Sequence, residues 1–316
     1  MNGLWDGLPS ATLAAIGECM IEIVRRPNGE TSFGYAGDTL NTSVYLARLG
    51  MRPSYVTALG VDPFSDAMLA FWQAEGIGTD LVVRRTDKLP GLYIVTTDDS
   101  GERKFHYWRD DAAARTLFTQ PGDLAQLAAL DGFPLLYWSG ISLAILSPPA
   151  RTKLIETMAR RRAEGGRVIF DTNFRPRLWP DISVAQNAYS VALANADIVF
   201  TSLGDEAPIF GGDEAALIAR HGHAGFGVRE LIVKNDRPGS RIVISDEKID
   251  HTIDTPSIAS VIDTTAAGDS FAAAYIAARA RGHDAKSAAL AGHRLAGAVC
   301  GVRGAIIPRD QMQNIL

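Results

Sequence analysis

The sequence predicts an α/β fold built on a mainly parallel sheet. Short apolar runs alternate with longer helical patterns along most of the chain, which is typical of strand–helix–strand units. Several of these runs continue directly into polar residues, as buried parallel strands do at the edge of a sheet that carries function. The expected strands are residues 12–16, 54–58, 135–138, 168–171, 198–201, 231–234 and 241–245.

Two predicted helices begin at polar segments. Asp38 is expected to cap a helix whose apolar residues recur at helical spacing and which Gly50 ends. A second helix is predicted from Gly268 to about residue 281, with Gly282 ending it.

Residues 81–108 interrupt this alternation. Strand-like runs at 81–85, 91–97 and 102–108 follow one another without a helix, and a turn is expected at 98–101. We predict an antiparallel hairpin inserted in the α/β body, which could serve as an edge extension, a dimer surface or a lid.

Composition and charge exclude several classes of protein. The 316 residues, 47% hydrophobic and 21% charged, are typical of one large or two modest folded domains. A net charge of -5 without long one-sign runs gives no support to nucleic-acid binding. Two cysteines are too few for a disulfide framework. No apolar run approaches the roughly 18 to 20 residues of a membrane helix, and the N-terminus lacks a signal-peptide pattern. We therefore expect a cytoplasmic protein with no membrane partner.

The stretch from Ala266 to Asp269 is the most informative part of the sequence. Ala266, Ala267 and Gly268 would let a ligand approach the backbone, and a helix start offers unpaired N–H groups to an anion. Asp269 could accept a proton from a hydroxyl while these donors stabilise a transferring phosphoryl group. A plain helix start, with Asp269 favourable for the helix dipole, accounts for the same residues equally well.

This stretch carries a family resemblance. Residues 263–269, Asp-Thr-Thr-Ala-Ala-Gly-Asp, resemble the Asp-Thr-x-Gly-Ala-Gly-Asp signature of the ribokinase-like (PfkB) carbohydrate kinases. Ala266 stands where many members have glycine, so the backbone there must tolerate a Cβ atom. The resemblance implies a three-layer α/β/α sandwich. It also implies a single domain, 1–316, with a small β lid contributed mainly by 81–108 and part of 18–36.

A second segment, residues 34–42, resembles the family's sugar-binding segment. Read from the residues alone, Gly37 allows close approach, and Asp38 and Asn41 offer polar groups to substrate hydroxyls. A helix cap followed by one solvated asparagine is the alternative.

Two segments, 37–42 and 170–179, resemble the branch of the family that phosphorylates 2-keto-3-deoxygluconate. Arg175 would then reach toward the substrate or the phosphate, because a guanidinium suits the oxygens of both. The resemblance also implies that Tyr93, Tyr107 and Arg109 contact the sugar acid, with Arg109 pairing its carboxylate. Cross-strand packing is the alternative for the aromatic residues.

For ATP and Mg²⁺, residues 202–206 take the place of the family's Asn-x-x-Glu motif, with Ser202 at the asparagine position. The resemblance implies that Asp205 or Glu206 organises the metal through water. The residues expected to border the nucleotide are Ser202, Lys234, Gly239, Ala267, Gly268 and His293. His221 and His223 are expected to be solvated and are assigned no role.

The resemblance as a whole implies an enzyme that phosphorylates 2-keto-3-deoxygluconate with ATP, Asp269 being the general base and Arg175 assisting. The alternatives are a fructokinase or related keto-sugar kinase, or a sugar or nucleotide sensor without catalysis. A monovalent cation such as K⁺ near Asp263 and Thr265 stays open, as does a homo-oligomer, dimer or larger.

Overall fold

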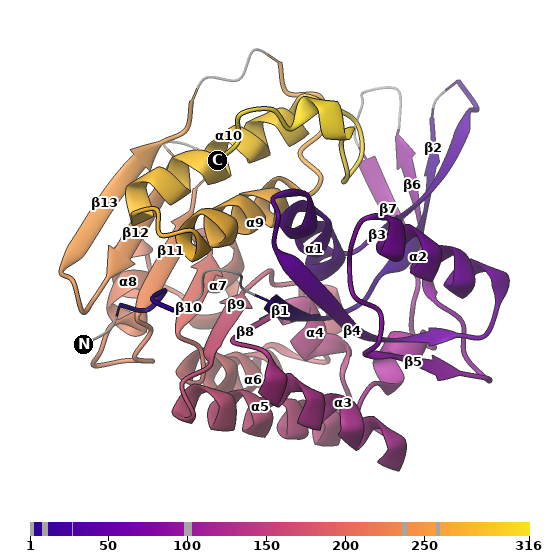
Figure 1. The fold of residues 1–316 in the computed structure, drawn as a ribbon, viewed down its shortest axis with the longest axis horizontal. Coiled ribbons are helices and arrows are strands. Elements are labelled where there is room, and N and C mark those ends of the chain that lie inside the picture. The colour runs from indigo at the N-terminus through magenta and orange to yellow at the C-terminus, as the bar shows by residue number, and fades with distance from the viewer. Residues whose placement is uncertain (1–2, 8–11, 27, 98–102, 236–238, 257–259) are drawn as a thin grey trace.

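The computed structural model of the chain describes residues 3–7, 12–26, 28–97, 103–235, 239–256 and 260–316. Its largest element is a sheet whose strands are β1 (Thr12–Ile16), β4 (Arg52–Gly60), β5 (Val82–Arg85), β8 (Leu135–Ser139), β9 (Arg167–Asp171), β10 (Ile198–Thr201), β11 (Glu230–Lys234), β12 (Gly239–Ile244) and β13 (Ile249–Asp254). Their order across the sheet is β13-β12-β11-β10-β9-β8-β1-β4-β5 (Figure 1). The strands from β11 to β5 pair in parallel with one another. β12 pairs antiparallel with both of its neighbours, β11 and β13. All seven strands predicted for the α/β body are present, whereas β13 was not predicted.

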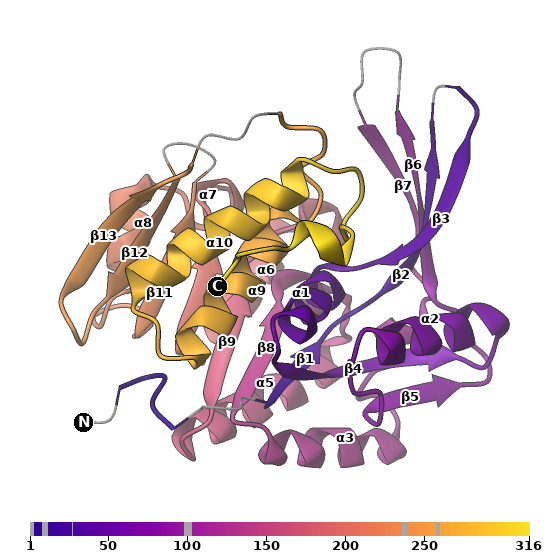
Figure 2. The same cartoon turned by 45° about the horizontal axis from the view of Figure 1, so that its top comes forward.

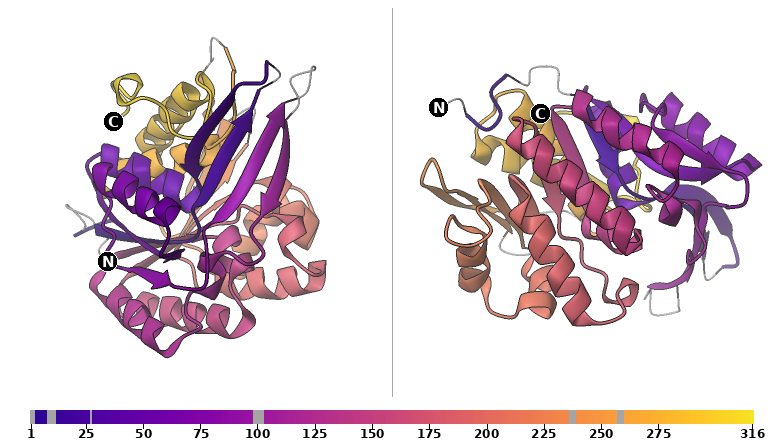
Figure 3. Two further views of the ribbon diagram at one scale, coloured as in Figure 1. Left: turned by 90° about the vertical axis from the view of Figure 1, so that its right-hand side faces the viewer. Right: turned by 90° about the horizontal axis from the view of Figure 1, so that it is seen from below.

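Helices cover both faces of this sheet. One face packs against α1 (Asp38–Arg48), α2 (Pro63–Ala74), α9 (Ala267–Ala280) and α10 (Ala285–Cys300). The other packs against α3 (Leu124–Ala129), α4 (Gly140–Ile145), α5 (Pro148–Ala163), α6 (Ile182–Ala194), α7 (Leu203–Phe210) and α8 (Glu214–His221) (Figure 3). Short 3₁₀ helices occupy Ala113–Thr116, Pro121–Asp123, Leu130–Gly132, Pro176–Leu178 and Arg309–Gln311.

The hydrophobic cores on the two faces of the large sheet follow from the alternation of side chains along its buried strands. Leu13 and Ala15 of β1 belong to the core under α1 and α9, whereas Ala14 and Ile16 belong to the core under α5 and α6. A strand buried on both faces explains the uninterrupted apolar runs in the sequence. The prediction of a three-layer α/β/α sandwich is therefore confirmed. Among the described helices, none combines the length and apolar character needed to cross a membrane.

A second sheet stands away from the body (Figure 2). Its strands, in the order β3-β2-β6-β7, are β3 (Thr31–Ala36), β2 (Met20–Arg25), β6 (Gly91–Thr97) and β7 (Arg103–Trp108). We call it the small sheet. The predicted hairpin of β6 and β7 is present, and its turn at 98–101 lies outside the described residues. The predicted start of this unit at residue 81 is wrong, because β5 pairs in parallel with β4 and so extends the large sheet.

Candidate active site

The functional side chains gather where the parallel strands end. Asp171 is the last residue of β9, Lys234 is the last residue of β11, and Ser202 follows β10 directly. Because carboxyl ends of parallel strands share one edge of a sheet, these residues from distant parts of the sequence become neighbours. The first turn of α9 faces the same edge, as the position that Cβ would take on Gly268 lies 3.4 Å from Nζ of Lys234.

Asp269 lies in the first turn of α9 and contacts α1. Nδ2 of Asn41 donates a hydrogen bond to Oδ2 of Asp269 over 2.9 Å. The hydroxyl of Thr42 donates to the backbone carbonyl of Asp269 over 3.3 Å. The two motifs that sequence analysis selected, 228 residues apart at this contact, therefore meet in one place.

The surroundings of Asp269 change its acidity. Burial raises the pKa of its carboxyl from 3.8 to about 7, and the carboxylates of Asp38 and Asp171 add to this rise. The hydrogen bond from Asn41 and the charge of Lys234 act in the opposite direction. A carboxyl that exchanges its proton near neutral pH is well matched to general base catalysis.

The backbone conformation at Ala266 explains why the family signature has glycine at this position. It is the N-cap residue of α9 and has φ 61° and ψ 14°, in the left-handed region. A residue with a Cβ costs about 1 kcal/mol or more in this conformation, so the position favours glycine. Alanine has no side-chain acceptor for the N–H groups of the first helical turn. The N–H of Ala267 donates to the carbonyl of Thr264 over 3.2 Å, so Gly268 and Asp269 are the better placed anion donors.

Lys234 and Asp171 form an ion pair at the centre of the site. Nζ of Lys234 donates to both carboxylate oxygens of Asp171, over 2.7 and 2.9 Å. Burial acts to lower the pKa of Lys234, but the carboxylates of Asp171 and Asp205 outweigh it and raise the pKa. Sequence analysis selected Lys234 but missed Asp171. The available signal was a carboxylate at the end of an apolar strand, directly before the segment 172–176.

Asp38 is the first residue of α1 and does not cap that helix, so this prediction is wrong. Gly37 is the N-cap residue. The Asp38 side chain turns instead into the site, where its Oδ2 accepts a hydrogen bond from Nδ2 of Asn173 over 2.8 Å. Asn173 has φ 29°, a conformation that asparagine tolerates better than most residues. Sequence analysis missed Asn173, although an asparagine in the Asp-x-Asn pattern after a strand was a usable signal.

Gly37 is required by the packing of the protein itself. A Cβ atom at Gly37 would lie 2.1 Å from the carbonyl oxygen of Glu18. The close approach that the sequence predicts at Gly37 is therefore made by the backbone of residue 18.

The two candidate metal residues differ completely in their surroundings. Asp205 is partly exposed, and its carboxylate accepts hydrogen bonds from the Phe174 backbone N–H and from the hydroxyl of Ser202. Glu206 is fully buried, and its oxygens are held by Thr201, Arg220 and His221.

Glu206 is therefore a structural residue. The prediction that it could organise a metal is wrong, because the side chain is 0% exposed and both of its oxygens are engaged by Thr201, Arg220 and His221. His221, expected to be solvated, is 1% exposed for the same reason. Within the described ranges, no cluster of three or more His, Cys, Asp or Glu side chains forms a direct metal site.

The small sheet presents an aromatic face. Tyr93 and Tyr107 are directly opposite in the ladder between β6 and β7, with ring centroids 5.8 Å apart. The hydroxyl of Tyr93 donates to the carboxylate of Glu22, and the ring is buried, whereas Tyr107 is exposed. Cross-strand packing, the alternative reading of these residues, is thus present and leaves Tyr107 accessible.

The two arginines expected to bind anions are placed differently. Arg109 is buried and forms an ion pair with the buried carboxylate of Glu18. The prediction did not foresee this internal partner. Arg175 is exposed, and its guanidinium donates to the backbone carbonyl of Phe174 over 3.2 Å.

Two residues expected near the nucleotide have clear structural roles. Gly239 has φ 145°, and a Cβ there would lie 2.0 Å from the carbonyl oxygen of Ile253. His293 shares a 2.9 Å hydrogen bond with the hydroxyl of Ser240, and its ring lies edge-on to Phe271. Burial lowers the pKa of His293, so the ring is neutral at pH 7.

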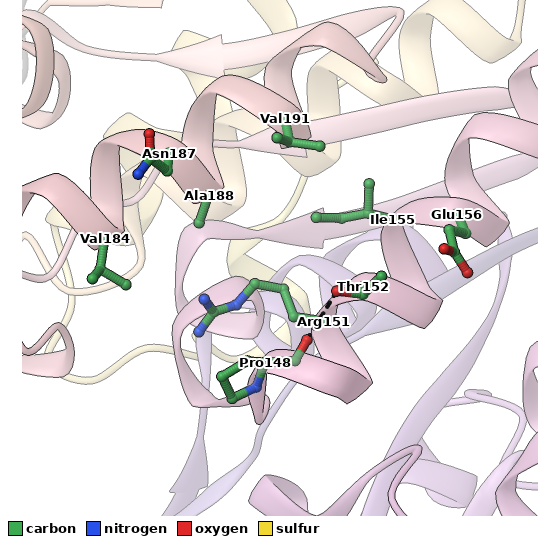
Figure 4. Close-up of a pocket in the computed structure, with 9 residues that line it drawn as sticks. All are labelled: Pro148, Arg151, Thr152, Ile155, Glu156, Val184, Asn187, Ala188 and Val191. Atoms are coloured by element: carbon green, nitrogen blue, oxygen red, sulfur yellow. Dashed lines mark hydrogen bonds between the residues drawn. The ribbon is translucent and has the colours of Figure 1, made fainter.

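A surface hollow of about 450 Å³ lies between α5 and α6, away from these residues (Figure 4). Its walls are mostly apolar side chains such as Ile155 and Val191. Arg151 lies at its edge and uses its guanidinium on the carbonyls of Leu143 and Leu146. The hollow contains none of the residues that meet at the strand ends.

Comparisons with known proteins agree with this geometry. Residues 10–312 match the family described as "pfkB family carbohydrate kinase". The 2-dehydro-3-deoxygluconokinase of Escherichia coli K12 is 45% identical over 312 residues, covering 96% of this chain and 99% of that protein.

Two solved structures match the fold across the whole chain. The structure of 2-dehydro-3-deoxygluconokinase from Thermotoga maritima matches with a TM-score of 0.83 at 20% identity, covering 96% of this chain and 99% of that one. Fructokinase with bound ATP from Xylella fastidiosa matches with a TM-score of 0.82 at 24% identity, covering 97% and 98%. These likenesses confirm the predicted ribokinase-like architecture. The chain therefore belongs to the pfkB family of carbohydrate kinases.

Proposed function

We propose that the chain is an ATP-dependent kinase that converts 2-keto-3-deoxygluconate, also called 2-dehydro-3-deoxygluconate, into 2-keto-3-deoxy-6-phosphogluconate. The observation that carries this proposal is the 45% identity, over 96% of the chain, to an Escherichia coli enzyme named for this sugar acid. The site supports it, because a carboxyl with a pKa of about 7 lies in the first turn of a helix that can stabilise a phosphoryl group.

In the proposed reaction, Asp269 accepts the proton of the terminal sugar hydroxyl. The hydroxyl oxygen forms a bond to the γ-phosphorus of ATP, and the bond from that phosphorus to the bridging oxygen breaks. ADP leaves with the electron pair of the broken bond. The N–H groups of Gly268 and Asp269, together with the Lys234 ammonium, would stabilise the charge on the transferring group.

Magnesium suits the oxygen ligands present, and when bound it would neutralise charge on the ATP phosphates. Asp205 is the carboxylate proposed to organise it. Both of its oxygens already accept hydrogen bonds from the protein, so a contact through water fits better than a direct one. Ser202, which caps α7 beside Asp205, would lie next to the same phosphates.

On the sugar side, we propose that Asp38 and Asn41 bind hydroxyl groups and that Tyr107 closes over the sugar as part of the small sheet. The exposed guanidinium of Arg175 can turn toward a carboxylate or phosphate. Arg109 can take part as well, since a guanidinium has five N–H groups and Glu18 does not use all of them. On this proposal the small sheet is the lid of one kinase domain.

The test is a coupled assay of ADP formation with 2-keto-3-deoxygluconate, 2-keto-3-deoxygalactonate, fructose and ribose. The proposal expects the highest kcat/KM for 2-keto-3-deoxygluconate. Equal or faster turnover of fructose would replace it with the fructokinase alternative. The same assay with and without K⁺ decides whether a monovalent cation is needed, and light scattering decides whether the protein is a dimer or larger.

A further inference from the structure

Glu18 lies between the end of β1 and the start of β2, where the small sheet joins the body. Its side chain is 1% exposed, and sequence analysis gave it no role. Glu18 lies beside residues at the base of every strand of the small sheet.

Three of the strands meet Glu18 through close contacts, and the fourth, β2, follows it in the chain. Cys19 alone separates Glu18 from β2. The carbonyl oxygen of Glu18 lies against Gly37, directly after β3, where a Cβ would be 2.1 Å away. Oε1 of Glu18 would be 2.8 Å from a Cβ on Gly91, the first residue of β6. Oε2 accepts a hydrogen bond from Arg109, directly after β7.

Glu18 and Arg109 form a buried ion pair where the small sheet joins the body. Both side chains are buried, with 1% and 7% exposure. A buried carboxylate without a cationic partner is strongly unfavourable, so each partner requires the other. Oε1 of Glu18 and Nε of Arg109 have no hydrogen-bond partner among the described residues. The Arg109 guanidinium therefore donates to Glu18 through its terminal nitrogen, and it lies 5.8 Å from the ring centroid of Tyr107.

We propose that Glu18 is a positioning residue for the sugar substrate. This inference rests on the proposed function. Glu18 holds Arg109 and the bases of the four strands in place, and through them it sets the position of Tyr93 and Tyr107 over the sugar. The residues proposed to bind ATP follow β10 and β11, whereas Glu18 follows β1, with β8 and β9 between them in the sheet. Loss of Glu18 should therefore affect sugar binding and leave ATP binding nearly unchanged.

The experiment compares Glu18→Gln with the matched control Glu230→Gln. Glu230 is also a fully buried carboxylate paired with an arginine, Arg279, but it lies at the start of β11, at the opposite end of the strands from Lys234. We expect Glu18→Gln to raise KM for 2-keto-3-deoxygluconate about tenfold, the size of effect when a hydrogen bond between charged groups is lost. KM for ATP should change by less than about twofold on the same reasoning. Glu230→Gln should lower the thermal unfolding temperature without changing either KM.

A double-mutant cycle separates positioning from general destabilisation. If Glu18 acts through Arg109, Glu18→Gln combined with Arg109→Met should resemble Arg109→Met alone in its KM for the sugar. Additive effects, or equal increases in both KM values, would overturn the proposal. If Glu18→Gln does not fold, Gly91→Ala tests the same contact, because its methyl group would press on Oε1 of Glu18. An unchanged sugar KM in folded Gly91→Ala would then overturn it.

The proposed function is judged separately, on wild-type turnover of 2-keto-3-deoxygluconate. If the wild type prefers another sugar, that proposal fails, and the split between the KM values for sugar and ATP is measured with the preferred sugar.

Discussion

Replacing Asp269 with asparagine should abolish most of the activity and at the same time stabilise the folded protein at alkaline pH. The pKa of this carboxyl rises from 3.8 to about 7 on folding, because burial and the nearby carboxylates of Asp38 and Asp171 disfavour its charged form. The native fold therefore opposes the ionisation that the proposed reaction requires. Asparagine keeps the size of the side chain and removes the charge.

The magnitude follows from the shift. About three pKa units at roughly 1.4 kcal/mol each give a cost of up to about 4 kcal/mol for the ionised group, and the partial exposure of Asp269 reduces this figure. The folded protein binds this proton more tightly than the unfolded chain. Its contribution to stability is therefore present below pH 3.8 and is lost as the pH rises toward about 7. The gain from Asp269→Asn should be about a third of its full size at pH 5 and reach its full size at pH 8.

The assay is urea unfolding of both proteins at pH 5 and pH 8, combined with turnover of the sugar acid. Turnover should fall by about 10² to 10⁴, the usual contribution of a general base. In the wild type, kcat/KM should rise with pH and level off above about pH 7.

Asp284→Asn is the matched control, because Asp284 caps α10 and backbone hydrogen bonds lower its pKa. It should gain no stability at pH 8. Equal stability of wild type and Asp269→Asn at pH 8 would refute the electrostatic reasoning, and unchanged turnover would remove Asp269 from the mechanism.

Three further predictions concern neighbouring residues. Ala266→Gly should keep activity and raise the free energy of unfolding by up to about 1 kcal/mol, because the left-handed backbone there favours glycine; a loss of stability in thermal unfolding would contradict this. Lys234→Met should raise KM for ATP and lower the free energy of unfolding by about 3 to 5 kcal/mol, because it leaves Asp171 buried without its cation. Adding Asp171→Asn should restore stability but not ATP binding. Asp205→Asn should shift the Mg²⁺ concentration needed for half-maximal rate, whereas Glu206→Gln should lower stability and leave that concentration unchanged; the reverse pattern in a magnesium titration would exchange their roles.

The strands of the α/β body could be predicted from sequence because each is a short apolar run that ends in polar residues. β1 was located with its boundaries, Thr12–Ile16. The small sheet was harder, because its strands alternate apolar and polar side chains and lie in two separate parts of the chain. β2 pairs with β6 in parallel, a contact between residues 20–25 and 91–96 that no local pattern encodes.

The individual site residues were easier to predict than their partners. Asp269 and Asn41 lie in segments that resemble motifs of the pfkB family, so both were selected. Glu206 was selected wrongly because neighbouring carboxylates on a helix look alike in sequence, and only the direction in which each points separates them. Asp205 turns toward the strand ends, whereas Glu206 turns toward His221 in the core.

The partners of the buried charges could not be predicted from the sequence either. Lys234 pairs with Asp171 and Arg109 with Glu18 across 63 and 91 residues. A buried charge must find a partner, so a buried arginine or lysine in this fold predicts that an acidic residue lies beside it. The sequence cannot say which acidic residue that is, because the order of strands in the sheet decides which residues become neighbours.

The chain as a whole carries net charge -5, so binding of two anionic ligands must rest on these few placed cations and on the uncapped start of α9. Neutralising Lys234 should for that reason weaken ATP binding far more than neutralising an exposed lysine such as Lys286, whose removal changes the net charge by the same amount.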